Sequence, residues 1–312
     1  MSCPLCSQHH HLAESDGDER ALADLASQIR EANTARQRDL LRATRAQLRL
    51  EASLDKKLRR SLRAAKSAVT DAVRVAADSG DLPALRGMDR DTLSRWLLDA
   101  GLGDLVLDIT EAERDTLANV EQLLLASSDG FDVNALEGIG QALADNTISG
   151  IIDDVIVPDV QRVVRDALAG AQFTADPSET IGSLDAALRS AEGRQITEAR
   201  TRITSFGREL TAVAAESAGI DHYLYTGPLE GTSKQKGITR PFCRQLVGKV
   251  FTKSQVQDLR NYQIEPPLVR GGGYNCRHTW APVSEELIES AGLDRGTNAD
   301  VRRANQAAKA AR

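Results

Sequence analysis

Thr239-Arg240-Pro241-Phe242-Cys243 and Gly271-Gly272-Gly273-Tyr274-Asn275-Cys276-Arg277-His278-Thr279-Trp280 are the two stretches that set the C-terminal part of this chain apart from the rest. The 312 residues contain only four cysteines and five histidines. Four of these lie in one 57-residue window, counted from 222 to 278: His222, Cys243, Cys276 and His278. The other five lie at the N-terminus: Cys3, Cys6, His9, His10 and His11. This distribution predicts a small metal-stapled module at the end of a long body that lacks both residue types.

The four residues of the C-terminal window are candidate metal ligands. Cys276 and His278 flank one residue, and a loop that follows three glycines can turn both side chains inward. Cys243 is the expected third ligand and His222 the expected fourth, with an aspartate or a water molecule as the alternative. Zinc is the expected ion, because thiolate and neutral imidazole are its usual tetrahedral ligands. The competing interpretation is that the cysteines are small buried apolar residues and His278 is a hydrogen-bonded core residue.

The sequence pattern changes at Gly219 from helical to mixed. Alternating residues predict strands over 222–226 and 247–251. Thr252-Lys253-Ser254-Gln255 is a capping box that predicts a short helix ending near Asn261. A small α/β module is therefore expected over 221–283, followed by a helical or disordered tail over 284–312. A metal ion in this module would be structural, because a thin core gains folding free energy from metal binding.

Residues 21–220 are expected to form a helical body. Apolar residues at helical spacing predict one long helix, or two helices in line, over 13–79. Such an element would reach about 90 Å at about 1.5 Å per residue. The remaining segments up to residue 220 have further helical patterns, and only 4% of the chain is aromatic. We therefore expect a mainly helical fold in which helices pack through aliphatic seams.

The N-terminal arm, residues 1–20, holds a second and weaker candidate metal site. Cys3, Cys6 and His9 have the spacing of zinc ligands. A single Cys-x-x-Cys lacks the second ligand pair that a zinc finger places across a folded loop, and chain termini are commonly disordered. A partner chain could complete such a site.

The charge of the chain is unevenly distributed. The whole chain has a net charge of −6, whereas the segment from Arg30 to Arg74 has 13 basic and 5 acidic residues, a local net of +8. Its candidate contacts to DNA phosphates or to an acidic partner are Arg42, Arg45, Arg49, Lys56, Lys57, Arg59, Arg60 and Arg63. Phosphate contacts would weaken with added salt. The segment lacks the interleaved aromatic residues that stack on bases, so the pattern favours a protein partner.

Four stretches of the C-terminal part carry a family resemblance: Tyr225-Thr226-Gly227-Pro228-Leu229, Thr239-Arg240-Pro241-Phe242-Cys243, Leu246-Val247-Gly248-Lys249-Val250-Phe251-Thr252 and Gly272-Gly273-Tyr274-Asn275-Cys276-Arg277-His278. In this order they resemble the C-terminal module of the Mu F-like head morphogenesis proteins, which are minor head proteins of tailed phages. Members place Thr-Arg shortly before a His or Cys, then a Gly-containing strand, then Asn-Cys-Arg-Cys or Asn-Cys-Arg-His. The resemblance covers roughly residues 196–283 and departs from the family at an insert over 230–237.

The resemblance implies a role for each matched residue. Cys243 takes the first ligand position and His278 the last. Structural roles, rather than simple surface solvation, are implied for the rest of the motif: Thr239, Arg240, Gly273, Asn275 and Arg277. The implied protein is a minor head component of the virion, assembled in the host cytoplasm and present in several copies at or near the portal. Its partners would be the portal protein, the major capsid protein or both, with packaged DNA as a further contact.

Two other classes of function compete with this expectation. A helical DNA-binding or bridging protein would use the basic segment, and a zinc-dependent hydrolase or toxin-like effector would need an open metal site. The chain has no His-Glu-x-x-His, no Ser-centred nucleophile elbow and no phosphate-binding loop. We therefore expect that the protein is not an enzyme. No apolar stretch approaches the length of a membrane span, so no membrane association is expected.

Overall fold

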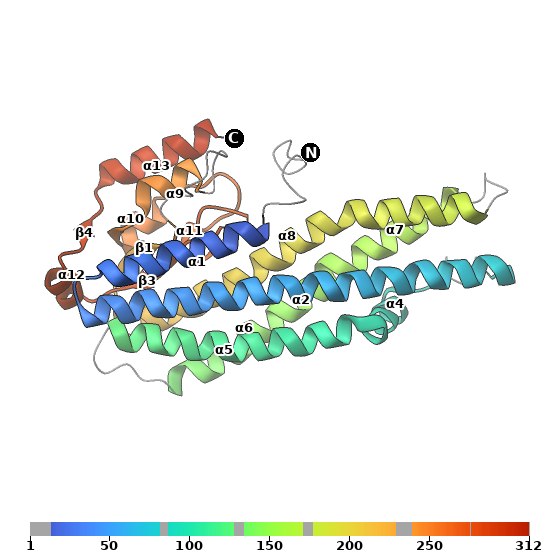
Figure 1. Ribbon diagram of the computed structural model, residues 1–312, viewed down its shortest axis with the longest axis horizontal. Helices are drawn as coiled ribbons and strands as arrows, with labels where there is room; N and C mark the ends of the chain where they lie inside the picture. Colours follow the sequence, from blue (N-terminus) through green and yellow to red (C-terminus); the bar gives the residue numbers. More distant parts are fainter. Residues whose placement is uncertain are drawn as a thin grey trace. The chain divides into compact units, whose positions relative to one another are not determined.

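The fold is mainly helical, with a long helix near the N-terminus and a small mixed sheet in the C-terminal part, as predicted (Figure 1). A computed structural model describes residues 14–81, 87–127, 134–170, 177–228, 239–274 and 276–311. The N-terminal candidate ligands Cys3, Cys6 and His9, and the motif residue Asn275, lie outside the described residues. No described helix combines the length and the hydropathy that crossing a bilayer requires.

Two compact units make up the chain. Unit 1 comprises Met1–Ala52, Glu113–Ala144 and Ile203–Arg312, and unit 2 comprises Ser53–Ala112 and Asp145–Arg202. The predicted helical body, residues 21–220, is therefore divided between them. All three of the ligand candidates Cys243, Cys276 and His278 belong to unit 1.

The first two helices, α1 (Glu14–Glu31) and α2 (Ala35–Ser79), are not in line. They lie side by side as a hairpin (Figure 1), and Arg45 of α2 donates a hydrogen bond to the carbonyl of Leu22 in α1. Asn33 and Thr34 make the turn between them, where the Thr34 hydroxyl accepts from the backbone N–H of Gln37. The hairpin forms because apolar residues of both helices bury one another: Leu25, Ala32, Leu41 and Leu48, with Leu22 and Ile29 beside them.

Among the described residues, the other helices before the sheet are α4 (Arg90–Leu97), α5 (Gly103–Ser127), α6 (Asn134–Ile151), α7 (Val157–Gly170) and α8 (Pro177–Ser217). Short π-helical segments interrupt them at η1 (Leu98–Leu102) and η2 (Ile152–Ile156). Gly101 in η1 has a φ of 125°, a conformation that glycine adopts easily. Pro177 stands in the first turn of α8, where its missing N–H has no intrahelical partner to lose.

The sheet has the order β3-β1-β2-β4 and lies in unit 1. β1 (His222–Thr226) pairs antiparallel with both β2 (Lys249–Thr252) and β3 (Thr279–Pro282). Because successive strand residues point to opposite faces, Tyr223 and Tyr225 pack into a core with Phe206, Phe242 and Trp280. The opposite face of the sheet packs a second core: Leu40, Ala43, Leu123, Leu224, Val250 and Ala281.

The C-terminal module extends beyond its predicted end at residue 283. β4 (Asp294–Arg295) pairs parallel with β2, after α12 (Glu285–Ala291). The last helix, α13 (Asn298–Ala310), packs against α9 (Pro241–Leu246) and buries Val301 and Ala304 in the same core as Phe242. The segment over 284–312, expected to be a helical or disordered tail, contains the helices α12 and α13, and the apolar contacts of α13 join it to the core of the module.

An ion pair between Lys249 on β2 and Asp300 on α13 links this helix to the sheet. Burial alone would raise the pKa of Asp300, but hydrogen bonds from Lys249, Thr297 and Arg303 hold it below its usual range. The Thr297 hydroxyl also caps the helix by accepting from the Asp300 backbone N–H. The predicted capping box at Thr252 and Gln255 is confirmed as well, and it opens α10 (Lys253–Gln257).

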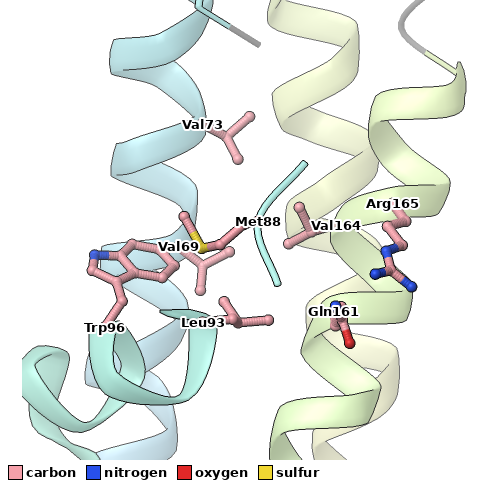
Figure 2. Close-up of a pocket in the computed structure, with 8 residues that line it drawn as sticks. All are labelled: Val69, Val73, Met88, Leu93, Trp96, Gln161, Val164 and Arg165. Carbon is pink, nitrogen blue, oxygen red and sulfur yellow. The ribbon is translucent and has the colours of Figure 1, made fainter. Parts of the chain in front are cut away.

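Unit 2 is a packed helical scaffold. The predicted apolar stripe of α2 is buried there: Leu54, Leu58, Leu62, Val69 and Val73. Figure 2 shows a small apolar pocket where α2, α4 and α7 meet, with Leu93 and Trp96 on α4 and Val164 on α7. Its volume of about 20 Å³ is close to the space of a single water molecule. The pocket is therefore a packing defect rather than a ligand site.

A buried ion-pair network joins α2 and α8 within unit 2. Asp55, of which 9% of the side chain is exposed, accepts from Arg59 at 2.9 Å and lies 3.6 Å from the guanidinium of Arg200. The Arg200 side chain is equally buried. Removing one member of such a network leaves an uncompensated charge in a site with little water.

Replacing Asp55 with asparagine should therefore destabilise the protein by about 3 to 5 kcal/mol, because the buried charge of Arg200 loses the carboxylate of Asp55. The matched control is Asp71→Asn on the same helix, whose ion pair with Arg74 has both side chains more than half exposed and should change stability by less than about 1 kcal/mol. Urea unfolding of both variants measures the difference. Equal losses of stability in the two variants would mean that the Asp55 ion pairs contribute no more to the free energy of unfolding than an exposed ion pair does.

Candidate metal centre

Cys243, Cys276 and His278 come together in one buried cluster. Their ligand atoms all lie within 4.8 Å of one another. The two Sγ atoms are 3.9 Å apart, and Cys276 Sγ is 3.7 Å from His278 Nδ1. Only 1%, 7% and 3% of the three residues are exposed, in the order named. The three predicted ligands are thus close enough, and in suitable positions, to hold a metal ion.

Three separate elements deliver these side chains. Cys243 lies on α9, which begins with Pro241 in its first turn after the extended Arg240. Cys276 follows the short helix α11 (Pro267–Arg270) and the glycine turn, and His278 directly precedes β3. The two cysteines are 33 positions apart in the sequence, so the tertiary fold is what brings their sulfur atoms together.

Gly272 and Gly227 lie so close to the candidate ligands that a Cβ atom at either position would clash with them. A Cβ on Gly272 would lie less than 3.0 Å from Cys243 Sγ and 3.4 Å from Cys276 Sγ. A Cβ on Gly227, at the end of β1, would lie 2.7 Å from the His278 ring. The backbone thus approaches the candidate ligands more closely than any residue with a side chain permits.

Hydrogen bonds around the ligands orient them for metal binding. His278 Nε2 lies 2.9 Å from the carbonyl oxygen of Pro228, which can only accept. The proton is therefore assigned to Nε2, and Nδ1 presents its lone pair toward Cys276. The backbone N–H of Gly272 donates to Cys276 Sγ at 3.1 Å, a contact that stabilises a thiolate.

Arg240 ties the glycine turn to α9. Its guanidinium donates to the carbonyl of Gly272 at 2.8 Å and to the carbonyl of Tyr274. The side chain is half-buried, which agrees with the structural role implied for it. Thr239 is buried and donates to the Pro228 carbonyl, the same oxygen that His278 contacts.

The other two described motif residues also surround the turn. Gly273 has a φ of 106°, and a Cβ there would lie less than 3.0 Å from the Gln263 side chain. Arg277 is half-buried between the two ligands Cys276 and His278. Gly273 therefore has a structural reason to be glycine, as the resemblance implies.

Arg208 supports the candidate ligands and was not singled out by the sequence analysis. This buried side chain of α8 donates to the carbonyls of Cys276 at 2.5 Å and His278 at 2.7 Å. It therefore holds both ligand-bearing residues against the helix, and its positive charge acts on the thiol of Cys276. The sequence offers only a weak signal for it, an arginine between the apolar residues Phe206 and Leu210.

The electrostatics of the cluster favour one thiolate. A hydrogen bond from the Cys243 thiol and the charge of Arg208 hold the pKa of Cys276 well below its usual range. The same hydrogen bond to Cys276, together with burial, raises the pKa of Cys243. Cys276 is therefore the sulfur that more readily carries a negative charge. A bound cation would displace any proton that the two thiols hold.

His222 does not belong to this cluster, and its prediction as the fourth ligand is corrected. It stands at the start of β1, where its register partner is Thr252, and its Nε2 lies 3.8 Å from a carboxylate oxygen of Glu285. The reason is the alternation of strand residues. Position 222 faces away from the side of the sheet on which Tyr225 meets the cysteines.

The basic residues predicted to contact DNA or a partner are partly engaged inside the protein. Lys57 pairs with Asp108 at 3.0 Å, and Arg59 pairs with Asp55. Arg45 donates to a backbone carbonyl. Five of the eight remain exposed: Arg42, Arg49, Lys56, Arg60 and Arg63. Even among these, ion pairs reduce the free charge of three: Arg42 with Asp39, Arg60 with Asp108 and Arg63 with Glu192.

Comparison with known proteins finds no relative of this chain. No protein-family model matches it, and neither does any curated protein or solved structure. The donor set remains the firmest guide to chemistry. Two sulfur atoms and one imidazole nitrogen, oriented by hydrogen bonds, fit a metal ion that prefers soft ligands.

Proposed function

We propose that this protein is a minor structural component of a tailed-phage head, and that a structural zinc ion holds its C-terminal module together. The observation that carries this proposal is the buried cluster of Cys243, Cys276 and His278. It is assembled from the same two stretches, 239–243 and 272–278, that resemble the Mu F-like head morphogenesis proteins. The motif residues Thr239 and Arg240 support the cluster through hydrogen bonds.

Zinc is the ion that the donor set supports best. Thiolate and imidazole ligands favour zinc over magnesium or calcium, which take oxygen ligands. A structural role is supported by the burial of all three ligands, because a catalytic zinc keeps one position open to water and substrate. When bound, the ion would supply a cross-link between α9, the glycine turn and β3. We accordingly propose no enzymatic activity.

The cross-linked module would act as a rigid docking surface. Zinc would fix the segments that carry Cys243 and His278, and Arg208 joins the segment of Cys276 and His278 to α8. A rigid surface loses little conformational entropy when it binds a partner. The proposed partners are the portal protein, the major capsid protein or both, within the virion head that assembles in the host cytoplasm.

Contact with packaged DNA is the weaker part of this proposal. Lys56, Arg60 and Arg63 are exposed at helical spacing on the unit 2 part of α2. Acidic side chains lie beside two of them, Asp108 at 3.9 Å from Arg60 and Glu192 at 4.0 Å from Arg63. This mixed surface favours a protein partner over a phosphate backbone.

The proposal has two direct tests. Quantitative mass spectrometry of washed, DNA-filled particles from the source phage or prophage should find a few to a few tens of copies of this chain per particle. Its absence would overturn the assignment to the head. Elemental analysis of the purified full chain, with Cys3 and Cys6 replaced by serine to silence the N-terminal arm, should find about one zinc per chain. A metal-free, fully folded protein would overturn the zinc centre.

A further inference from the structure

The candidate centre has three ligands from cysteine and histidine, and a structural zinc site almost always has four. Among the described residues, no other cysteine, histidine or carboxylate joins the cluster. Apart from the backbone N–H of Gly272, which can only donate, the phenol oxygen of Tyr225 is a polar atom that contacts both sulfurs. Its Oη lies 3.3 Å from Cys243 Sγ and 3.6 Å from Cys276 Sγ.

We infer that Tyr225 Oη is the fourth protein ligand of the metal centre. The inference rests on the proposed function, because it presupposes that the cluster binds a metal ion. It adds a residue that ligand spacing alone does not reveal. It also changes the character of the site, since four protein ligands leave no position for water.

Four of the six separations between these four ligand atoms are close to the edges of a tetrahedron around a metal ion, and the ligand atoms of Cys243 and His278 lie within 4.8 Å of each other. Metal–sulfur bonds of about 2.3 Å and metal–nitrogen or metal–oxygen bonds of about 2.0 Å give sulfur–sulfur edges of about 3.8 Å and sulfur–nitrogen or sulfur–oxygen edges of about 3.5 Å. The structure has 3.9 Å for the two sulfurs and 3.7 Å for Cys276 Sγ to His278 Nδ1. The two sulfur–oxygen separations, 3.3 Å and 3.6 Å, bracket the expected edge.

Packing holds the phenol ring in this position. Tyr225 is fully buried, its ring stacks on His278 with centroids 5.2 Å apart, and Trp280 packs against it at 4.4 Å. β1 pairs with β3 through Tyr225 and Trp280, so the strand register places the ring beside the ligands. A ring fixed in this way presents Oη to the cluster without a further loss of side-chain entropy.

The charge of the completed centre is compensated nearby. On binding a divalent ion, Cys243, Cys276 and Tyr225 each give up any proton they hold to solvent, and His278 stays neutral. Two thiolates and one phenolate around a 2+ ion leave a net charge of −1. The buried guanidinium of Arg208, which donates to the backbone carbonyls of Cys276 and His278, offsets this charge.

The test uses the full chain with Cys3 and Cys6 replaced by serine, freed of metal and titrated with Co²⁺ or Zn²⁺. Co²⁺ reports sulfur ligands through charge-transfer bands, and either ion reports a phenolate ligand through the ultraviolet band of ionised tyrosine. We expect the tyrosinate band to grow with one equivalent of metal. Tyr225→Phe should lose this band and bind Zn²⁺ about 10- to 100-fold more weakly in competition with a chelator.

Tyr223→Phe is the matched control. Tyr223 is equally buried on the same strand, and its hydroxyl has no hydrogen-bond partner among the described residues. This variant should keep both the tyrosinate band and the affinity. The band in the unmodified Tyr225 protein does not depend on whether any variant folds, so the inference stays testable if Tyr225→Phe is unstable.

The outcomes separate the two proposals. Sulfur-to-cobalt bands without a tyrosinate band, together with full affinity in Tyr225→Phe, would mean that Tyr225 only donates a hydrogen bond to a sulfur. That result overturns the fourth ligand and leaves the metal centre standing. The absence of sulfur-to-cobalt bands at saturating Co²⁺ would overturn the metal centre itself, and the proposed fourth ligand with it.

Discussion

Replacing Cys276 with serine should abolish metal binding by the C-terminal module and lower its melting temperature by on the order of 10 °C. Cys276 Sγ is the central donor of the cluster, with Cys243, His278 and Tyr225 all within 3.9 Å of it. A serine hydroxyl is a poor ligand at neutral pH and leaves the N–H of Gly272 without its sulfur acceptor. Elemental analysis and thermal melting monitored by near-ultraviolet circular dichroism measure the two effects.

His222→Ala is the control for this experiment. His222 is the residue that ligand counting favours, yet it faces away from the cluster and lies beside Glu285. The variant should retain its metal and melt within about 2 °C of the parent, because it loses only a 3.8 Å contact between a half-buried imidazole and an exposed carboxylate. If Cys276→Ser still held one metal ion per chain, or if His222→Ala lost it, the ligand set derived from the structure would be incorrect.

Replacing Gly272 with alanine should be nearly as damaging although it removes no ligand. The new methyl group would lie less than 3.0 Å from Cys243 Sγ and 3.4 Å from the ring of Phe242. Neither neighbour is the free end of a long side chain, so the glycine turn itself must shift. We expect a stability loss of about 3 kcal/mol or more and a metal affinity lowered by at least about 10-fold.

Urea unfolding and chelator competition measure these two losses, with Gly182→Ala as the matched control. A Cβ on Gly182, which is exposed on α8, would meet no atom within 4 Å. Alanine there should be neutral or stabilising by up to about 1 kcal/mol, because glycine is a poor helix former. Near-identical behaviour of the two variants would show that the turn has room that the structure does not indicate.

Local pattern was enough to predict most of the helical body. The stripe from Leu54 to Val73 is buried as its spacing required, and the capping box at Thr252 begins a helix at the expected residue. The reversal between α1 and α2 was not predictable in the same way. A periodic pattern indicates that a helix has an apolar face, but it does not indicate whether the next helix continues in line or folds back to cover that face.

Some residues of the candidate site were likewise predictable from the sequence, and others were not. Cysteine and histidine are rare in this chain, and their clustering in the sequence identified Cys243, Cys276 and His278 without any coordinates. The same count suggested His222, because a one-dimensional list contains no information about strand faces. Tyr225 and Arg208 could not be singled out, since a tyrosine in a strand and an arginine in a helix are ordinary core and surface residues until their neighbours are known.

Residue types and their spacing were therefore enough to give the available chemistry: helical periodicity, a Gly-rich turn, and two soft-ligand residue types confined to two short segments. Which of these groups meet depends on the tertiary structure. The fold brings the sulfur atoms of Cys243 and Cys276 to 3.9 Å although the residues are 33 positions apart. It also points His222 away from the cluster and places Tyr225 and Arg208 beside it. The physical reason is that ligation and burial depend on distances of a few ångströms, which strand register and helix packing set and which residue spacing does not record.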